Sequence, residues 1–551
     1  MARRAHVYPQ VEPGAGATID ARVATLPAAA SVAAALRVAR KRDVGVLDVG
    51  MRGHVVLRAD LARADALGLA DLRAADLARP VPVVDAGASE VRVRRAMAAG
   101  APIVLVVGRR GPIGAAMRPP ALVSTPAMAS AFVRRLPERM VHVTTLAAAL
   151  AARQHAAAYV VGGVARDLFR EARSETGDLD IVIEGDGHRL AREIAETLGA
   201  PLVLHDRFLT ASVDVPGVGT VDVITARSER YEHRGALPRV MPAGIQQDLE
   251  RRDFTINAMA IELTSDDRPL LDPYGGRADL ERERIRILHP LSFVDDPTRM
   301  FRAARYAARL GFVLDTWTAR CRRLALSLVP YPALSGPRIV AEVERILDDA
   351  RPDDALSRLG RAGVFRLLDP DYRFTQETAH RVAQLAESLR WGASLGLAAA
   401  PVELALLVLL AEQPAATARR ALARLGFSGE PSTRVERALD AGRTLPAALA
   451  AARTPSRRAA LLRGRSAAEV AWVGLVGGAA ARRAVEEFQT RTGAIASELR
   501  GEDVIALGVP RGPAVAQALA ALRDARIDGE VPDRAGEAGY VRRWFITREE
   551  G

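Results

Sequence analysis

Three patterns of apolar and polar residues follow one another along the 551-residue chain. From about residue 20 to residue 120, short apolar runs alternate with amphipathic stretches, which predicts small strands between helices. Residues 140–288 contain a strand, a Gly-Gly turn, a helix and further strands, which is typical of an α/β domain. Beyond residue 288 apolar residues recur at helical spacing, which predicts a helical neck (289–375) and a helical body and tail (376–551). The sequence therefore predicts a multidomain protein with α/β parts before an all-α part.

The first segment contains one unit twice. The stretches SVAAALRVARKRD, from Ser31, and SEVRVRRAMAAGA, from Ser89, each precede a strand, a turn and a second strand. Among the expected strands are Val44–Val49, Val55–Arg58 and Ile103–Val107. A linker rich in Pro, Ala and Ser is expected to follow, from about Pro119 to Pro137.

Composition narrows the class of protein. Apolar residues make up 49% and charged residues 26%, which is ordinary for a soluble globular chain. No apolar run reaches the roughly 18 residues that span a bilayer, and MARRAHVYPQ at the start has no signal-peptide core. The single cysteine, Cys321, excludes an internal disulfide and a cysteine-rich zinc site. We therefore expect a cytoplasmic protein without a membrane partner.

The charge of the chain bears on its partner. The net charge is +11 and the chain has one lysine, Lys41, so nearly all the cations are arginines. Arginine is a good fork for phosphates and base edges, but an Arg- and Ala-rich genome explains the same composition. The aromatic content of 4% argues against a base-stacking sheet. Charge alone only slightly favours a polyanionic partner.

The chemistry concentrates around a glycine turn. The apolar run from Tyr159 ends in Gly162 and Gly163 and opens a helix that carries Arg166 one turn in. Glycines at a strand-to-helix turn let backbone amides approach a phosphate, and the arginine could reach the same phosphates. Most Gly-Gly pairs are simply turns, so this element is weak evidence by itself.

Two aspartates follow the turn at strand spacing. Asp178 and Asp180 share one face of a strand, because side chains two residues apart point the same way, while Leu179, Ile181 and Ile183 would face the core. A divalent cation would relieve the repulsion between the two carboxylates. Asp222, between two valines on a later strand, supplies a third carboxylate. The alternative is a solvated, polar strand start.

These elements resemble the nucleotidyltransferase superfamily typified by DNA polymerase β. Further strings narrow the resemblance to the bacterial tRNA nucleotidyltransferase and poly(A) polymerase branch, also called class II. They are RRDFTINAMA from Arg251, DPYGG from Asp272, DDPTR from Asp295, and SGPRIVAE from Ser335. The resemblance implies a polymerase β-like head at 140–288 before the helical parts.

The resemblance also implies roles for individual residues. It makes Asp178, Asp180 and Asp222 the catalytic ligands of two Mg²⁺ ions. Further residues are implied in nucleotide binding, with the choice between the two neighbouring arginines left open: Gly162, Gly163, Arg166, Arg251, Arg252, Asp296, Arg299, Arg302 and Arg305. A last group is implied in support of the site: Asp253, Asn257, Arg338 and Glu342.

The implied base-reading residues have a regular spacing. Asp296, Arg299, Arg302 and Arg305 recur every three residues, which predicts one helix face over about three turns. An Asp acceptor and an Arg fork can hydrogen-bond cytosine or adenine, so protein would replace a template. The alternative is a salt-bridged helix surface.

The implied function is addition of C and A to the tRNA 3′ end from CTP and ATP. Addition of A alone ranks second and poly(A) synthesis third. The stretch from Arg227 to Leu249 resembles the loop of A-incorporating members, which disfavours CC-only activity. The tail, with its turn from Leu507 to Pro513, resembles the tRNA-binding region.

The N-terminal repeat resembles a tandem CBS pair, a module that often binds adenine nucleotides. Asp60 lies where that family has its ribose-binding aspartate, but Leu57 replaces the usual Ser or Thr. An alternative is a structural module that pairs two copies into a homodimer. A rival reading of the whole chain is a nucleotide-sensing regulator with an inactive head, and another is an RNA-binding scaffold.

Overall fold

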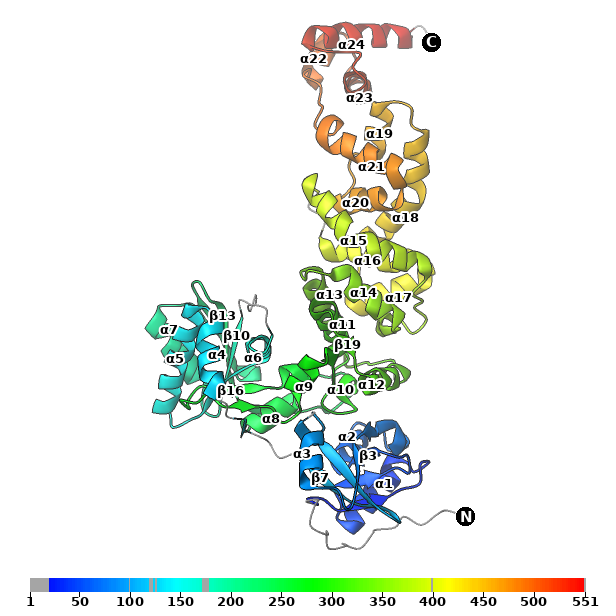
Figure 1. Cartoon of the computed structure of the whole chain (residues 1–551). Helices are drawn as coiled ribbons and strands as arrows, with labels where there is room; N and C mark the ends of the chain where they lie inside the picture. Colours follow the sequence, from blue (N-terminus) through cyan, green and yellow to red (C-terminus); the bar gives the residue numbers. More distant parts are fainter. Residues whose placement is uncertain are drawn as a thin grey trace. The chain divides into compact units, whose positions relative to one another are not determined.

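The computed structural model describes residues 19–98, 100–117, 122–123, 126–170, 178–397 and 400–549. The N-terminal decapeptide, on which the signal-peptide prediction depends, and the expected linker start at Pro119 lie outside these residues. The chain divides into two compact units, one ending at Ser335 and one starting at Gly336 (Figure 1). Their boundary falls inside the predicted neck, 289–375. No described helix is long and apolar enough to cross a membrane.

Residues 19–117 form the N-terminal module, in which one arrangement of elements occurs twice. Each copy has a strand, a helix and two more strands, the first pair parallel and the second antiparallel. The Ser31 hydroxyl accepts from the backbone N–H of Ala34 and caps the first helix. This confirms the predicted repeat. The elements are β1 (Val23–Thr25), α1 (Val32–Arg42), β2 (Val46–Asp48), β3 (His54–Leu57), α2 (Arg58–Ala66) and β4 (Arg79–Pro80), then β5 (Val83–Asp85), α3 (Glu90–Ala98), β6 (Ile103–Gly108) and β7 (Gly111–Met117).

The expected linker is wrong over part of its length. Pro126–Arg135 forms the helix α4, and Leu122–Val123 forms the strand β8, which pairs with β17 (Leu270–Leu271). Alanine and methionine favour a helix once it packs on a neighbour, and α4 packs on α5 (Glu138–Arg153). The segment therefore joins the head.

The head contains an eight-stranded sheet. Its order is β11-β12-β13-β10-β9-β16-β17-β8, and β10 is parallel to β13 but antiparallel to β9. Helix α7 (Gly187–Leu198) packs on β12 and β13, and α5 packs on β9. The strands not yet given are β9 (Ala158–Val161), β10 (Leu179–Ile183), β11 (Leu202–His205), β12 (Thr210–Val215), β13 (Gly219–Thr225) and β16 (Ala260–Glu262).

Strand β10 has apolar residues on both faces, except at Asp180, the second residue of the strand. Leu179, Ile181 and Ile183 are fully buried on one face, as predicted. On the other face Val182 packs into a cluster with Tyr159 and residues of α8 (Ile245–Glu250). Only the first polar position of that second face stays partly open, and it is occupied by Asp180.

Short helices follow the sheet up to Ser335. The two-residue strands β18 (Arg284–Ile285) and β19 (Val313–Leu314) pair in parallel and hold the start of this region together. Its helices are α9 (Gly276–Glu281), α10 (Ser292–Asp295), α11 (Arg299–Leu310) and α12 (Thr316–Ser327).

The second unit is helical throughout its described residues, which confirms the predicted all-α part. Helix α13 (Gly336–Leu347) starts against the end of α17 (Ala415–Leu425), because a side chain at Gly336 would meet the carbonyl oxygens of Arg424 and Leu425. The C-terminal turn leads from α22 (Gly501–Ala506) into α23 (Pro513–Ile527), as expected. The other helices are α14 (Pro352–Arg361), α15 (Gln376–Ser394), α16 (Pro401–Leu410), α18 (Glu430–Ala451), α19 (Pro455–Leu462), α20 (Ala467–Val476), α21 (Gly478–Glu487) and α24 (Arg534–Glu549).

Candidate active site

Two of the three predicted carboxylates lie side by side on the sheet. Asp180 of β10 is the register partner of Asp222 on the parallel neighbour β13. Residues in register on adjacent strands are about 4.8 Å apart and project to the same face. Asp178 directly precedes β10, two residues before Asp180, and is exposed. The strand register therefore places Asp180 beside Asp222, and Asp178 lies two residues away along the chain.

The charges of these carboxylates act on one another. Burial raises the pKa of Asp180, and repulsion from Asp222 and Asp178 raises it further, while Arg252 and Arg302 oppose the rise. The direction shows that burial and the two neighbouring carboxylates together outweigh the two arginines. A cation bound here would stabilise the ionised form.

The glycine turn packs directly against this acidic face. Gly162 has φ +68°, and a Cβ on it would lie 2.5 Å from Oδ2 of Asp180 and 3.6 Å from Nη1 of Arg252. Only glycine tolerates both the left-handed backbone and the close approach of the carboxylate. Gly163 is the second residue of α6 (Gly162–Asp167), which follows the turn. The glycine turn therefore lies directly against the carboxylate of Asp180.

The donor set suits a divalent cation that prefers oxygen. Carboxylates are the ligands of Mg²⁺ in proteins, and three are available on this face. Asp222 is meanwhile held by the Ser212 hydroxyl, which donates to its Oδ1 at 2.6 Å. Within the described residues, no three His, Cys, Asp or Glu side chains are grouped closely enough to hold a metal ion. The residues fit the ion by chemistry, but the side chains are not drawn together around it.

A buried aspartate that sequence reasoning missed organises the arginines beside the turn. Asp248 on α8 is fully buried, and its two oxygens accept from Arg251, at 2.8 and 3.0 Å, and from Arg252, at 3.0 and 3.2 Å. Burial alone would raise the pKa of Asp248, but the two guanidiniums outweigh it and the pKa is lowered. The spacing of three and four residues on a helix was the available signal.

The two arginines differ in what else they contact. Arg251 also donates to Oε1 of Glu229 at 3.0 Å, so its guanidinium is fixed between two acids. Arg252 lies against Gly162 and is the largest cationic influence on Asp180. Of the pair that the sequence left open, Arg252 is the one at the glycine turn.

Arg166, for which the sequence predicts a phosphate contact, is buried and paired within the head. Its side chain is 1% exposed and makes a bidentate pair with Asp167, at 2.8 and 3.0 Å, plus a bond to Oδ1 of Asn257 at 3.0 Å. Each of the three guanidinium nitrogens thus donates to an oxygen of Asp167 or Asn257. In this structure Arg166 joins α6 to the 3₁₀ turn Thr255–Asn257.

The predicted helix face over residues 296–305 is wrong at its start. Asp296 has an extended backbone between α10 and α11, and Arg299 is the first residue of α11. Oδ1 of Asp296 accepts from the N–H and hydroxyl of Thr298, at 3.0 and 2.7 Å. Pro297 explains the break, because the residue before a proline is driven from helical to extended backbone.

Arg299 is buried beneath this segment. It donates to the Ser292 hydroxyl at 2.7 Å and to the carbonyl oxygen of Arg251 at 2.6 Å. A small cavity of about 90 Å³ adjoins it, lined also by Tyr231 and Arg251. The predicted base-reading residue Arg299 and one arginine of the pair, Arg251, therefore line the same cavity.

The next two arginines of α11 surround a tyrosine that the sequence did not single out. Arg302 pairs with Asp253 at 2.6 Å, and Asn257 donates to the other oxygen of Asp253 at 3.0 Å. The guanidiniums of Arg302 and Arg305 lie 5.6 and 5.3 Å from the ring centre of Tyr306. Asp253 and Asn257 thus link Arg302 to Arg166.

Three predicted residues lie outside this arrangement. Arg338 and Glu342 are on α13 in the second unit, where Glu342 is buried and accepts from Arg345 at 2.8 Å. Asp60 is buried in the N-terminal module and accepts from Arg79 at 2.8 Å. Its carboxylate is therefore already neutralised by an arginine of its own module.

The N-terminal module reaches the cavity beside Arg299 through a residue that was also missed. Arg63 of α2 donates to Nε2 of His289 at 2.7 Å and to Oδ2 of Asp295 at 3.1 Å. Because an arginine only donates, His289 must be the acceptor and therefore neutral, in agreement with its strongly lowered pKa. Burial raises the pKa of Asp295 to about 6, against the opposing charges of Arg63 and Arg299.

Comparison with known proteins gives a consistent set of relatives. Residues 158–286 match the family described as the poly A polymerase head domain. A CC-adding tRNA nucleotidyltransferase of Deinococcus radiodurans is 33% identical over 390 residues, which cover 70% of this chain and 89% of that protein. An A-adding tRNA nucleotidyltransferase of Geobacter sulfurreducens is 33% identical over 69% of this chain and 44% of the relative. The chain spans about half or less of the length of the A-adding relatives it matches.

Solved structures agree with these relatives. An apo form of a CCA-adding enzyme matches 75% of this chain and 97% of its own, with a TM-score of 0.67 and 28% identity. A Thermotoga maritima CCA-adding enzyme complexed with tRNA matches 75% and 97%, with a TM-score of 0.62 and 25% identity.

Proposed function

Because the chain belongs to the tRNA nucleotidyltransferase family, we propose that it adds nucleotides to the 3′ end of tRNA without a nucleic-acid template. It takes CTP and ATP, completes the CCA end in the cytoplasm, where its tRNA substrate is found, and releases pyrophosphate. The observation that carries the proposal is the acidic face of Asp180 and Asp222, in register, against the turn of Gly162. Addition of A alone is the alternative, with poly(A) synthesis behind it.

The acidic face would hold the metal of this reaction. Two Mg²⁺ ions on Asp178, Asp180 and Asp222 would lower the pKa of the tRNA 3′-hydroxyl and neutralise the triphosphate and the leaving pyrophosphate. The chain itself supplies position: Gly162 lets the triphosphate come close to the backbone, and Arg252 offers a cationic fork beside it. In phosphoryl transfer such positioning and charge neutralisation provide most of the catalysis.

Selection of the base falls to the segment at the start of α11. Asp296 offers carboxylate oxygens and Arg299 offers a guanidinium, the acceptor and donors that an incoming cytosine or adenine edge requires. The buried bonds of Arg299 to Ser292 and to the carbonyl of Arg251 hold it in one orientation. A fixed donor set allows protein to replace a template.

The stretch from Arg227 to Leu249 supports incorporation of A. It forms a two-stranded hairpin, β14 (Arg227–Arg230) and β15 (Arg239–Pro242), and then leads into α8. Tyr231 and Glu229 from this stretch line the cavity beside Arg299. Their position beside Arg299 supports a role of this stretch in accepting the incoming base.

The second unit would hold the tRNA, and the N-terminal module would act beside the reaction. A helical, arginine-rich unit suits shape-based contacts to RNA phosphates, with strong salt dependence. The module's repeat fits a CBS-like pair that binds an adenine nucleotide or pairs two chains. Against ribose binding by Asp60 stands its pairing with Arg79.

The test uses purified protein and three tRNA substrates, which end before the first C of the CCA end, after one C, or after both. CTP and ATP are offered separately and together, with and without EDTA. Addition of both bases, lost with EDTA, is expected. Incorporation of A only on the –CC end selects the A-adding alternative. Binding of tRNA or AMP without any incorporation would contradict the enzyme assignment and favour the scaffold or regulatory reading.

A further inference from the structure

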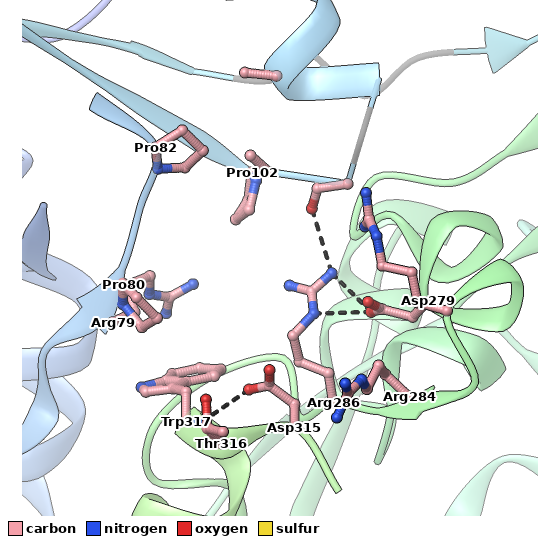
Figure 2. A pocket seen from close by; sticks show the side chains of 14 residues that line it. Arg79, Pro80, Pro82, Pro102, Asp279, Arg284, Arg286, Asp315, Thr316 and Trp317 are labelled. Carbon is pink, nitrogen blue, oxygen red and sulfur yellow. Dashed lines mark hydrogen bonds and ion pairs between the residues drawn. The ribbon is translucent and has the colours of Figure 1, made fainter. Parts of the chain in front are cut away.

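A cavity of about 500 Å³ lies between the N-terminal module and the segment that leads from the sheet of the head into its short helices. Figure 2 shows Arg79 and Trp317 on one side of the opening, Arg286 and Arg284 on another, and Pro82 and Pro102 on a third. None of the residues of the candidate active site lines it. The cavity is therefore a separate place in which a ligand could bind.

The lining carries more positive than negative charge. It contains four arginines, at positions 79, 282, 284 and 286, against two aspartates, Asp279 and Asp315. Asp279 accepts from Nε of Arg286 at 2.8 Å, and Asp315 accepts from the backbone N–H of Trp317 at 2.9 Å as the N-cap of α12. Asp60, outside the lining, pairs with Arg79, so one arginine remains in excess, and an excess of one sign of charge attracts the opposite sign. The site suits an anion.

The other two sides of the cavity carry most of its apolar residues. Pro80, Pro82 and Pro102 are rigid, and the indole of Trp317 lies under the guanidinium of Arg79 at 5.3 Å. Nε of Arg79 is buried and, among the described residues, has no hydrogen-bond partner. A buried donor without an acceptor costs free energy that a bound acceptor would recover. The volume falls in the range of about 300–1,000 Å³ that small-molecule sites occupy.

We propose that this cavity is a second ligand site, for a compact organic anion in which a flat ring carries a phosphate group. The ring lies against the prolines and the indole, and the phosphate lies between Arg282, Arg284 and Arg286. A nucleoside phosphate has this combination of parts; an inorganic anion or an uncharged ring has only half of it. The proposal does not depend on the nucleotidyltransferase reaction, because the site shares no residue with the acidic face.

Calorimetry on the full chain tests the proposal, with ADP, adenosine and pyrophosphate as probes in EDTA. Arg284 is exposed on β18, so Arg284→Ala and Arg284→Glu should leave the fold intact, which thermal unfolding checks. Loss of one charged hydrogen bond is expected to weaken ADP binding by about tenfold or more for Arg284→Ala, and further for Arg284→Glu. Arg323→Ala, which removes an exposed arginine outside the cavity, is the matched control and should change nothing.

Asp296→Ala separates this site from the active site, because it changes only the latter. ADP binding that survives Asp296→Ala and falls with Arg284→Glu supports the proposal. ADP binding that falls with Asp296→Ala and ignores Arg284→Glu overturns it, as does absence of ADP binding. Adenosine as tight as ADP would overturn the anionic part, and pyrophosphate as tight as ADP would overturn the ring part.

Discussion

Two charged regions meet at Gly162, and they differ in how their charges are compensated. The acidic face consists of Asp178, Asp180 and Asp222, where burial and mutual repulsion raise the pKa of Asp180. The second region, here called the arginine layer, consists of Asp248, Arg251 and Arg252. Asp248 is fully buried, and the two arginines hold its pKa below its ordinary value. In both regions burial acts on a carboxylate that arginines of the chain oppose, but only in the second do those arginines outweigh burial.

The difference indicates where a ligand acts and where the fold prepares for it. A buried charge without a partner costs free energy, which a fold accepts only where binding later removes the cost. The arginine layer is complete before any ligand arrives, so it can hold donors in fixed directions. The acidic face is incomplete and gains from a cation. Substitutions in the two regions should therefore have opposite signatures.

The largest effect is expected at the acidic face. Asp180→Ala should reduce incorporation of labelled nucleotide on the order of 10⁴-fold or more, because it removes a residue that acts as part of a catalytic unit. Without metal its thermal stability should be unchanged or higher, since a repelled carboxylate is lost, and tRNA binding should remain. Asp267→Ala, at an exposed turn between β16 and β17, is the control. Retained turnover in Asp180→Ala would contradict the metal assignment.

The opposite signature is expected in the arginine layer. Asp248→Asn keeps the shape but leaves Arg251 and Arg252 buried without their shared counter-charge. Breaking a buried pair in this way typically costs about 3–5 kcal/mol, so the urea midpoint should fall sharply. Activity should fall as well, by about a hundredfold, since a 1 Å misplacement of positioning groups has that effect. An unchanged urea midpoint would show that Asp248 does not stabilise the buried charges of Arg251 and Arg252.

The same contrast explains what could be predicted from the sequence. The acidic face and its glycine turn follow local patterns: Asp180 lies on β10 and Asp178 directly before it, two residues away, and the buried positions of β10 follow from the same two-residue period. Whether an arginine is free or enclosed depends on tertiary packing. Arg166 had the right spacing for a phosphate, yet Asp167 and Asn257 enclose it. The break at Pro297 was visible in the sequence, and the three-residue spacing on either side of it obscured the extended Asp296.

A third experiment separates the two arginines that Asp248 holds. Arg252→Ala should raise KM for the nucleotide by about tenfold, because its guanidinium lies at the glycine turn and a charged hydrogen bond to phosphate is of that size. Arg251→Ala should instead lower stability more than it changes KM, since Arg251 bridges Asp248 and Glu229. Steady-state kinetics and thermal unfolding of both variants give the comparison. If both variants changed KM equally, the assignment of Arg252 to the turn would be wrong.

The smallest effect on stability is expected where Arg63 of the N-terminal module contacts His289 and Asp295. Asp295 is the carboxylate there whose pKa burial raises, to about 6, despite the opposing charges of Arg63 and Arg299. A folded-state pKa above the unfolded value means that the folded chain holds the proton more tightly. Stability from this group is therefore complete at low pH and is lost as the pH rises through about 6.

Arg63→Gln should extend that loss to higher pH. Arg63, His289, Asp296 and Arg299 face Asp295, and His289 is neutral, so removal of Arg63 leaves one arginine to oppose burial and the pKa of Asp295 rises further. Each added pKa unit corresponds to about 1.4 kcal/mol, and thermal unfolding between pH 5 and pH 8 measures it. Arg58→Gln, on the same helix but paired with exposed Asp43, is the control. Identical pH profiles for Arg63→Gln and Arg58→Gln would show that the N-terminal module does not change the pKa of Asp295. A difference that disappears in an Asp295→Asn background would show that it acts through that one carboxylate.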